Sequence, residues 1–289
     1  MFINFFKIIF LLVANLTLAQ DFNARNNPAL VSIIPSNGIF LVEENYYFGV
    51  KIELQQGWKT YWKNPGDAGA PISIELKDSS IENKLKVLFP FPEKFTDHGV
   101  STIGYEGQVI FPVRIQKDEI DKINEKINLD YLVCKDICIP ISETKNLNLN
   151  LQNVVQSDVF LESYKTVPKR KSNYFNIDEN IVSSEKISIE LINTDEFENI
   201  ELFAYAEDTN LKVKKLKSSF EVFLDNDIGS LNSPIEFSIS NGNVYEEISF
   251  DFNQKSKKTQ IIYFIILAFL GGLILNFMPC VLPILSLKL

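Results

Sequence analysis

The sequence predicts a mainly β protein with two tandem β-sandwich (immunoglobulin-like) domains followed by one truncated transmembrane helix. Segments in which apolar and polar residues alternate recur between residues 20 and 254, and turn-forming residues separate them. Short strands at this spacing are typical of β-sandwiches. An uncharged apolar segment closes the chain and accounts for the predicted helix. The 289 residues leave room for about two domains, and 46% hydrophobic residues suffice for packed cores.

Residues 1–19 are predicted to be a cleaved secretory signal peptide. Lys7 provides the positive start, and residues 8–18 form an apolar stretch. Thr17 and Ala19 are small residues at the positions that precede a cleavage site, so cleavage is predicted after Ala19. The alternative is an uncleaved anchor helix, for which the apolar run is too short. The residues that follow are therefore expected outside the cytoplasm.

Residues 20–155 are predicted to form the first β-domain. Apolar and polar residues alternate in 46–54, and the segments 108–115 and 126–133 repeat this pattern. Residues 118–126 are predicted to form a short helix.

The alternation of apolar and polar residues stops after residue 155, which ends the predicted first domain. Residues 156–175 include a basic, proline-containing stretch, which predicts a linker. Alternation then returns at 187–191, 220–224 and 235–239, so residues 176–254 are predicted to form the second β-sandwich. One larger domain over both blocks is the alternative.

Residues 260–289 are predicted to form a transmembrane helix. No charged residue lies between 261 and 287, and about 20 apolar residues are enough to cross a bilayer. Proline, asparagine and serine within a span need other protein around them, which indicates a fragment of a longer membrane protein. Three lysines precede the span and one follows it, which opposes the orientation set by a cleaved leader. We take the signal peptide to set the orientation of the chain. The alternative for residues 260–289 is a buried helix of a soluble protein.

Charge and composition exclude several classes of function. The chain has 28 basic and 37 acidic residues, a net charge of −9, which argues against a nucleic-acid partner. A single histidine argues against His-rich zinc sites and against a Ser-His-Asp hydrolase. Three cysteines are an odd number, so at least one has no disulfide partner within the chain.

Cys134 and Cys138 are the first candidates for chemistry. In a straight strand their Cα atoms would lie about 13 Å apart, too far for a disulfide. They can bond only if residues 135–137 form a turn. Spacing alone leaves open a redox-active pair and a structural disulfide in an exported domain. Two thiolates would also suit Cu(I) or zinc, but no third ligand is evident, so no metal is predicted.

Cys280 is the third candidate, within the predicted membrane helix. A single buried cysteine is most often a small apolar side chain. Pro279 and Pro283 flank it and interrupt the helical hydrogen bonds, which leaves irregular backbone where a partner thiol could approach.

Five stretches of the sequence resemble the DsbD/ScsB family of thiol:disulfide interchange proteins. The segment GGLILNFMPCVLPILSLKL at the end of the chain is similar to the opening of the family's electron-conducting membrane domain. The upstream stretches resemble its exported amino-terminal region, in the ScsB-like branch: GWKTYWKNPGDAGAP at 57–71, FPFPEKF at 89–95, GYEGQVIFPV at 104–113 and YLVCKDICIP at 131–140. Residues 176–252 carry no such motif.

The resemblance implies transfer of reducing equivalents across the bacterial inner membrane. Cytoplasmic thioredoxin would reduce a membrane cysteine pair, and electrons would then pass through a carboxy-terminal thioredoxin-like domain to the exported amino-terminal domain. That domain would reduce periplasmic disulfide-containing proteins without an organic cofactor. Cys134 and Cys138 match the exported pair and Cys280 the first membrane cysteine, while the family's remaining cysteines lie beyond Leu289. The bulk of the chain is accordingly expected in the periplasm.

The family also shields its exported cysteine pair with a loop. By position this active-site cap corresponds to residues 96–103, with His98, Gly99, Val100, Ser101 and Thr102 at its centre. It could control access to the two cysteines, or be an ordinary hairpin connection. His98 is either a proton donor or a solvated loop residue.

Two other functions remain open from the sequence. One is a non-enzymatic, membrane-tethered β-sandwich that binds partners and uses the disulfide as a structural link. The other is a copper-handling periplasmic protein, suggested by the copper association of the ScsB branch. A proline-flanked Cys280 favours the redox function, because a simple tether has no need of a thiol there.

Overall fold

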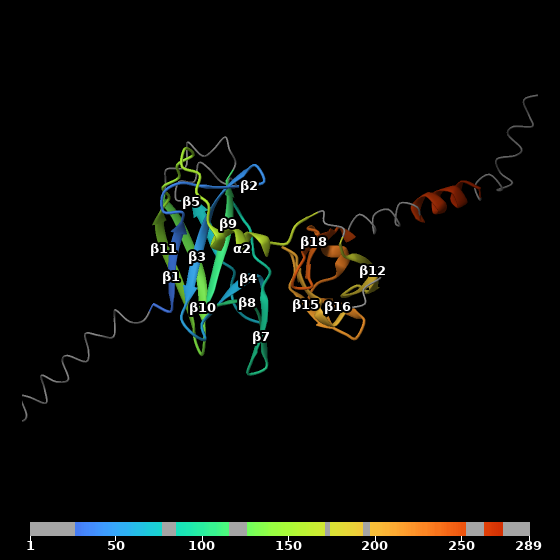
Figure 1. The fold of residues 1–289 in the computed structure, drawn as a ribbon. Helices are drawn as coiled ribbons and strands as arrows, with labels where there is room; N and C mark the ends of the chain where they lie inside the picture. The colour runs from blue at the N-terminus through green and yellow to red at the C-terminus, as the bar shows by residue number, and fades with distance from the viewer. Residues whose placement is uncertain are drawn as a thin grey trace, which may run out of the picture. The chain divides into compact units, whose positions relative to one another are not determined.

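The computed structural model describes residues 27–76, 85–115, 126–170, 174–192, 197–252 and 263–273. The chain divides into two compact units, Met1–Val167 and Pro168–Leu289 (Figure 1). Strands dominate both units, which confirms the mainly β prediction. The predicted strands at 46–54, 108–115 and 126–133 correspond to observed strands in the first unit, and those at 187–191, 220–224 and 235–239 to strands in the second.

Two antiparallel sheets form the first unit. The first sheet has the order β1-β3-β9-β6, with β2 paired to β3: β1 (Ala29–Ile34), β2 (Phe40–Val42), β3 (Asn45–Leu54), β6 (Leu85–Val87) and β9 (Gln108–Ile115). The second sheet has the order β11-β10-β4-β8-β7, with β5 paired to β10: β4 (Lys59–Gly66), β5 (Ser73–Leu76), β7 (Glu93–Asp97), β8 (Val100–Glu106), β10 (Lys126–Cys134) and β11 (Cys138–Asn146).

The two sheets pack face to face around an apolar core. Phe48, Val50 and Ile52 of β3 alternate on one face and are fully buried, as the two-residue period of a strand requires. Phe111 of β9 lies on the same face and contacts Tyr105 of β8 edge-to-face, with ring centroids 5.3 Å apart. Such aromatic pairs contribute about 0.5–1.5 kcal/mol beyond the area they bury. The alternation in the sequence thus fixes which face is internal.

A short helix covers the other face of the first sheet. Helix α2 (Asp158–Lys165) begins after Ser157, whose side chain accepts a hydrogen bond from the backbone N–H of Phe160. Phe160 is fully buried and stacks on Phe40, with centroids 3.9 Å apart. Residues 156–175 were predicted to be a linker; the structure places this helix within them, because one N-cap and one buried aromatic side chain are enough to hold two turns against a sheet.

The second unit also consists of two antiparallel sheets. One has the order β12-β13-β16-β15: β12 (Asn176–Ser183), β13 (Lys186–Ile192), β15 (Leu211–Lys215) and β16 (Ser219–Leu224). The other has the order β14-β17-β18: β14 (Glu201–Tyr205), β17 (Ile235–Ser240) and β18 (Tyr245–Phe250). The 3₁₀ turns η3 (Phe197–Asn199) and η4 (Ile228–Ser230) lie between strands. Both sheets contribute to one apolar cluster, which includes Ile189, Phe220 and Phe237.

Several sequence predictions fall outside the described residues. These are the signal peptide at 1–19, Cys280, and residues 118–125 of the predicted helix; Lys126 itself opens β10. Residues 263–273 are helical. Among the helices that the structure describes, none combines the length and apolar character needed to cross a membrane.

Candidate functional site

Cys134 and Cys138 form a disulfide at the tip of the β10–β11 hairpin. Cys134 ends β10, Cys138 begins β11, and the two are opposite one another in the ladder with Cα atoms 4.1 Å apart. The turn that the bond requires is present at residues 135–137, where the backbone N–H of Lys135 donates to the carbonyl of Ile137 at 3.1 Å. The hairpin, rather than a long-range contact, therefore brings the two sulfur atoms together.

The two cysteines differ in their access to solvent. Cys134 is only 6% exposed, whereas Cys138 is exposed at the start of β11. Ile137, between them, is 67% exposed, more than any other large apolar side chain described within residues 27–252. A reagent approaching the bond thus meets Cys138 first and Ile137 beside it.

The disulfide lies on the outer face of the second sheet, which we define as the face that carries Cys134. Ile127, Leu129 and Val133 of β10 are fully buried on the opposite, inner face. Strand residues alternate between faces, so Cys134 projects outward and so does Cys138, its partner in the ladder. The site is therefore a surface feature supported by a packed core.

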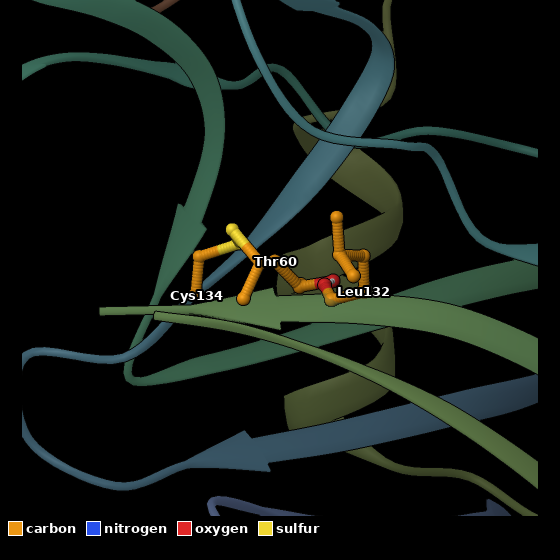
Figure 2. Close-up of a disulfide and its surroundings, with 4 residues drawn as sticks. Thr60, Leu132 and Cys134 are labelled. Carbon is orange, nitrogen blue, oxygen red and sulfur yellow. Dashed lines mark hydrogen bonds between the residues drawn. A yellow bond between two sulfur atoms is a disulfide. The ribbon is translucent and has the colours of Figure 1, made fainter. Parts of the chain in front are cut away.

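Strand β4 supports the disulfide from the other side of β10. The ladder between these two strands consists of the single pair Cys134–Lys59. Thr60, which is fully buried, adds a side-chain bond: its hydroxyl donates to the carbonyl of Leu132 at 3.1 Å (Figure 2). Figure 2 shows this contact close to the sulfur atoms. One ladder pair and one hydroxyl thus fix β4 beside the disulfide.

Replacing Thr60 with valine should lower the free energy of unfolding of the first unit by about 1 kcal/mol, because the part-buried carbonyl of Leu132 loses its donor. Thr60→Ser keeps the hydroxyl and is the matched control. Urea unfolding followed by tryptophan fluorescence reports on this unit alone, since both tryptophans, Trp58 and Trp62, lie in it. A valine variant as stable as the serine variant would contradict the assigned role.

The residues predicted as a cap lie in the β7–β8 hairpin. His98 and Gly99 form its two-residue turn, with φ of 50° and 84°, the combination typical of a type I′ hairpin turn. Both are exposed, and Val100 is 42% exposed. This turn and the β10–β11 turn project from the same end of the unit (Figure 1). Of the two sequence predictions for these residues, the hairpin connection describes their backbone. A capping function stays a prediction.

Contacts on both strands hold this hairpin to β4 and its following turn. On β8, the backbone N–H of Ser101 donates to the carboxylate of Asp67, and the carbonyl of Ser101 accepts from the N–H of Asp67. Thr102, almost fully buried, pairs with Gly66. On β7, the Asp97 carboxylate accepts from the Lys59 ammonium. The predicted cap is thus connected through Lys59 to the strand next to Cys134.

Lys59 occupies a central place that sequence analysis missed. Its side chain is 15% exposed, and its ammonium pairs with Asp97 and lies 4.3 Å from the centroid of the Phe95 ring. Asp97 also acts on the neighbouring Tyr61: burial, and secondly the charge of Asp97, raise the pKa of that phenol above its ordinary value of 10. Lys59 lies within the family-like stretch at 57–71, but nothing in that stretch relates it to Cys134, because the relation arises from pairing between strands distant in sequence.

Cys280, the third predicted site residue, lies outside the described residues. Within the part of the chain that the structure describes, no group of three or more histidine, cysteine, aspartate or glutamate side chains has the arrangement of a metal site. The chemistry that the described site offers is that of the Cys134–Cys138 disulfide itself.

Comparisons with known proteins agree with this geometry. Residues 34–150 match the family described as thiol:disulfide interchange protein DsbD, N-terminal. The crystal structure of the N-terminal periplasmic domain of ScsB from Proteus mirabilis is similar, with a TM-score of 0.59 at 18% identity over 78% of this chain and 93% of that chain. At that identity the likeness concerns the fold.

Two further solved structures align far less well. A marsupial T cell receptor and an I-band fragment of titin each align with 77% of this chain at 10% identity, over 94% and 87% of their own chains, with TM-scores of 0.18. No curated protein sequence matches the chain. The family match covers the disulfide, its hairpin and the β4 strand beside it. Residues 34–150, most of the first unit, therefore match the DsbD amino-terminal domain family.

Proposed function

We propose that this chain is the periplasmic part of a DsbD/ScsB-type protein-disulfide reductase, and that it reduces disulfides of periplasmic proteins through Cys134 and Cys138. The observation that carries the proposal is the Cys134–Cys138 bond at a solvent-facing hairpin tip, with Cys138 exposed and Cys134 buried. A disulfide that only held the fold together would gain nothing from an exposed cysteine next to an exposed isoleucine.

The exchange reaction takes place in two balanced steps. In the reduced pair, the Cys138 thiolate attacks one sulfur of a partner disulfide, so a Cys138–partner bond forms and the second partner sulfur leaves as a thiolate. The Cys134 thiolate then attacks the Cys138 sulfur, which forms the Cys134–Cys138 bond and releases the other partner sulfur as a thiolate. The pair loses two electrons and the partner gains them.

The solvent exposure of the two cysteines assigns the attacking and the resolving role. An incoming disulfide must approach the attacking sulfur along the bond it will break, which a buried thiol prevents. Cys138 is exposed and Cys134 is 6% exposed, so Cys138 meets the partner and Cys134 resolves the mixed disulfide. The two sulfur atoms hold the electrons between steps, so the reaction needs no organic cofactor.

The remaining parts of the proposal rest on the sequence and on its resemblance to the family. The leader at residues 1–19 would direct the chain to the periplasm, and residues 260–289 would form its first helix in the inner membrane. Electrons would reach the pair from cytoplasmic thioredoxin through a membrane pair that includes Cys280 and through a thioredoxin-like domain. The two units would be tandem immunoglobulin-like sandwiches.

A redox titration of the full chain tests the proposal. The chain is equilibrated with dithiothreitol or glutathione buffers, alkylated, and the thiols at Cys134 and Cys138 are counted by peptide mass. We expect a midpoint well above about −300 mV, the region in which exchangeable disulfides lie. A bond that stays closed well below that value would make the disulfide structural and the chain a tethered binding protein, and would overturn the proposal.

A further inference from the structure

Four residues from four strands form one transverse row across the second sheet. In the ladders, Cys138 is opposite Cys134, Cys134 is opposite Lys59, and Lys59 is opposite Glu106. Directly opposed residues of antiparallel strands project to the same face, with Cβ atoms about 4.5–5.5 Å apart. All four side chains therefore start from the outer face, and Lys59 is the neighbour of Cys134 across the strand.

The Lys59 ammonium is engaged by strand β7, on the side of β4 away from β10. It pairs with Asp97 and lies over Phe95, both of which are on β7. Because the Lys59 side chain is 15% exposed, its charge is only partly screened by water. A thiolate that appears at Cys134 thus forms on the strand next to Lys59, whose ammonium Asp97 holds in the closed state.

We propose that Lys59 is a positioning residue for disulfide exchange, and that its ammonium stabilises the Cys134 thiolate when the Cys134–Cys138 bond opens. This inference rests on the proposed function. When a donor thiolate attacks the Cys138 sulfur, a donor–Cys138 bond forms, the Cys134–Cys138 bond breaks, and Cys134 leaves with the electron pair. A leaving thiolate of lower basicity departs faster, so Lys59 favours entry of electrons into the pair.

The other charged groups near the disulfide are engaged elsewhere or offset one another. Glu106, the last member of the row, accepts from the backbone N–H of Gly57 at 3.2 Å. Lys135 extends over the same glycine, where a Cβ atom would lie 3.2 Å from its Cε. Asp136 is exposed in the turn, directly after Lys135. Lys59 is the charged residue that the ladder places directly opposite Cys134.

Substitution of Asp97 distinguishes this inference from a purely structural role of Lys59. In the closed state Asp97 shares the Lys59 ammonium, so it competes with a Cys134 thiolate for the same charge. Removing Lys59 should destabilise the thiolate, whereas removing the charge of Asp97 should stabilise it. If the Lys59–Asp97 pair merely fastened the β7–β8 hairpin, both changes would act in the same direction.

The experiment uses the full chain carrying Cys138→Ala and Cys280→Ala, so that Cys134 is the one thiol. Its ionisation is followed by the ultraviolet absorbance of the thiolate as a function of pH, which does not depend on reagent access. With Lys59→Met we expect the pKa of Cys134 to rise by about 1 unit, since a nearby opposite charge commonly shifts a pKa by that much or more. Lys59→Arg should retain the wild-type value, and Asp97→Asn should lower it.

A second measurement separates this inference from the proposed function. In chains with both cysteines, the equilibrium with glutathione at pH 9 should shift towards the disulfide in Lys59→Met, about 3–10-fold, which corresponds to roughly 15–30 mV. Shifts of the same sign in Lys59→Met and Asp97→Asn, or no shift in either, would overturn the role of Lys59 while the pair remained exchangeable. A parent disulfide that no buffer opens would instead overturn the proposed function.

Discussion

Replacing Cys134 with alanine should convert the chain from an exchanging protein into a trap. Reduced Cys134→Ala chain treated with oxidised glutathione will form a mixed disulfide at Cys138 that persists, whereas the chain with both cysteines will release glutathione and close its own bond. The reason is proximity: an intramolecular thiol has an effective concentration of about 10⁵ M or more in well-oriented cases. Without Cys134, free thiols at millimolar concentration must open the adduct, so its lifetime should increase at least about a thousandfold.

The matched control is Cys138→Ala, measured in the same way by peptide mass. Its remaining thiol, Cys134, is 6% exposed, so the glutathione adduct should form roughly tenfold more slowly or not at all. Both variants also carry Cys280→Ala, so that no third thiol reacts. Equal adduct formation on the two single-cysteine chains would contradict the assignment of Cys138 as the attacking residue.

Gly104→Ala should be the most destabilising small substitution near the site. Gly104 lies on β8 opposite Tyr61, and a Cβ added to it would come 2.0 Å from the backbone carbonyl oxygen of Thr60. Backbone atoms cannot move aside as the end of a flexible side chain can, so the added Cβ would force β4 and β8 apart. We expect a loss of about 3 kcal/mol or more in the free energy of unfolding of the first unit, at the upper end of overpacking effects.

Gly99→Ala is the comparison for this prediction. Its added Cβ would meet nothing within 4 Å, and the cost comes only from a φ of 84°, about 1–2 kcal/mol. Urea unfolding monitored by tryptophan fluorescence gives both values. If Gly104→Ala lost no more stability than Gly99→Ala, the close approach of β4 and β8 would be wrong. The same variants would show whether separating these strands also alters the redox midpoint of the disulfide.

The internal strands of both units could be predicted because burial imposes a simple period on them. In β10, and in the second half of β3, every second residue faces the core, and the alternation in the sequence follows this directly. Helix α2 was missed because it is only two turns long and buries one residue, Phe160, which is too few for a helical period to appear. Ser157 before it, an N-cap residue, was the signal that could have revealed it.

The cysteines of the site could be found from the sequence, but their supports could not. Cys134 and Cys138 are close in the chain, and a single turn between them is the one local structure that allows a bond. Lys59 and Thr60 contact this hairpin only because β4 joins β10, and the order of strands in a sheet is set by packing between distant segments. The charge relation between Lys59, Asp97 and Cys134 therefore becomes visible only in the folded structure.

The position of the disulfide at the end of its ladder has a consequence for the direction of electron flow. Eight further residue pairs join β10 to β11, from Lys126–Asn146 to Val133–Ile139, and none of them needs the bond. We therefore expect that opening the bond frees only the three-residue turn, while the remaining pairs keep the rest of the hairpin in place. Oxidised and reduced forms then present nearly the same shape, so a partner has little basis for choosing between them by fit. Net transfer in either direction would follow the difference in reduction potential between the two proteins, as in a reversible electron carrier.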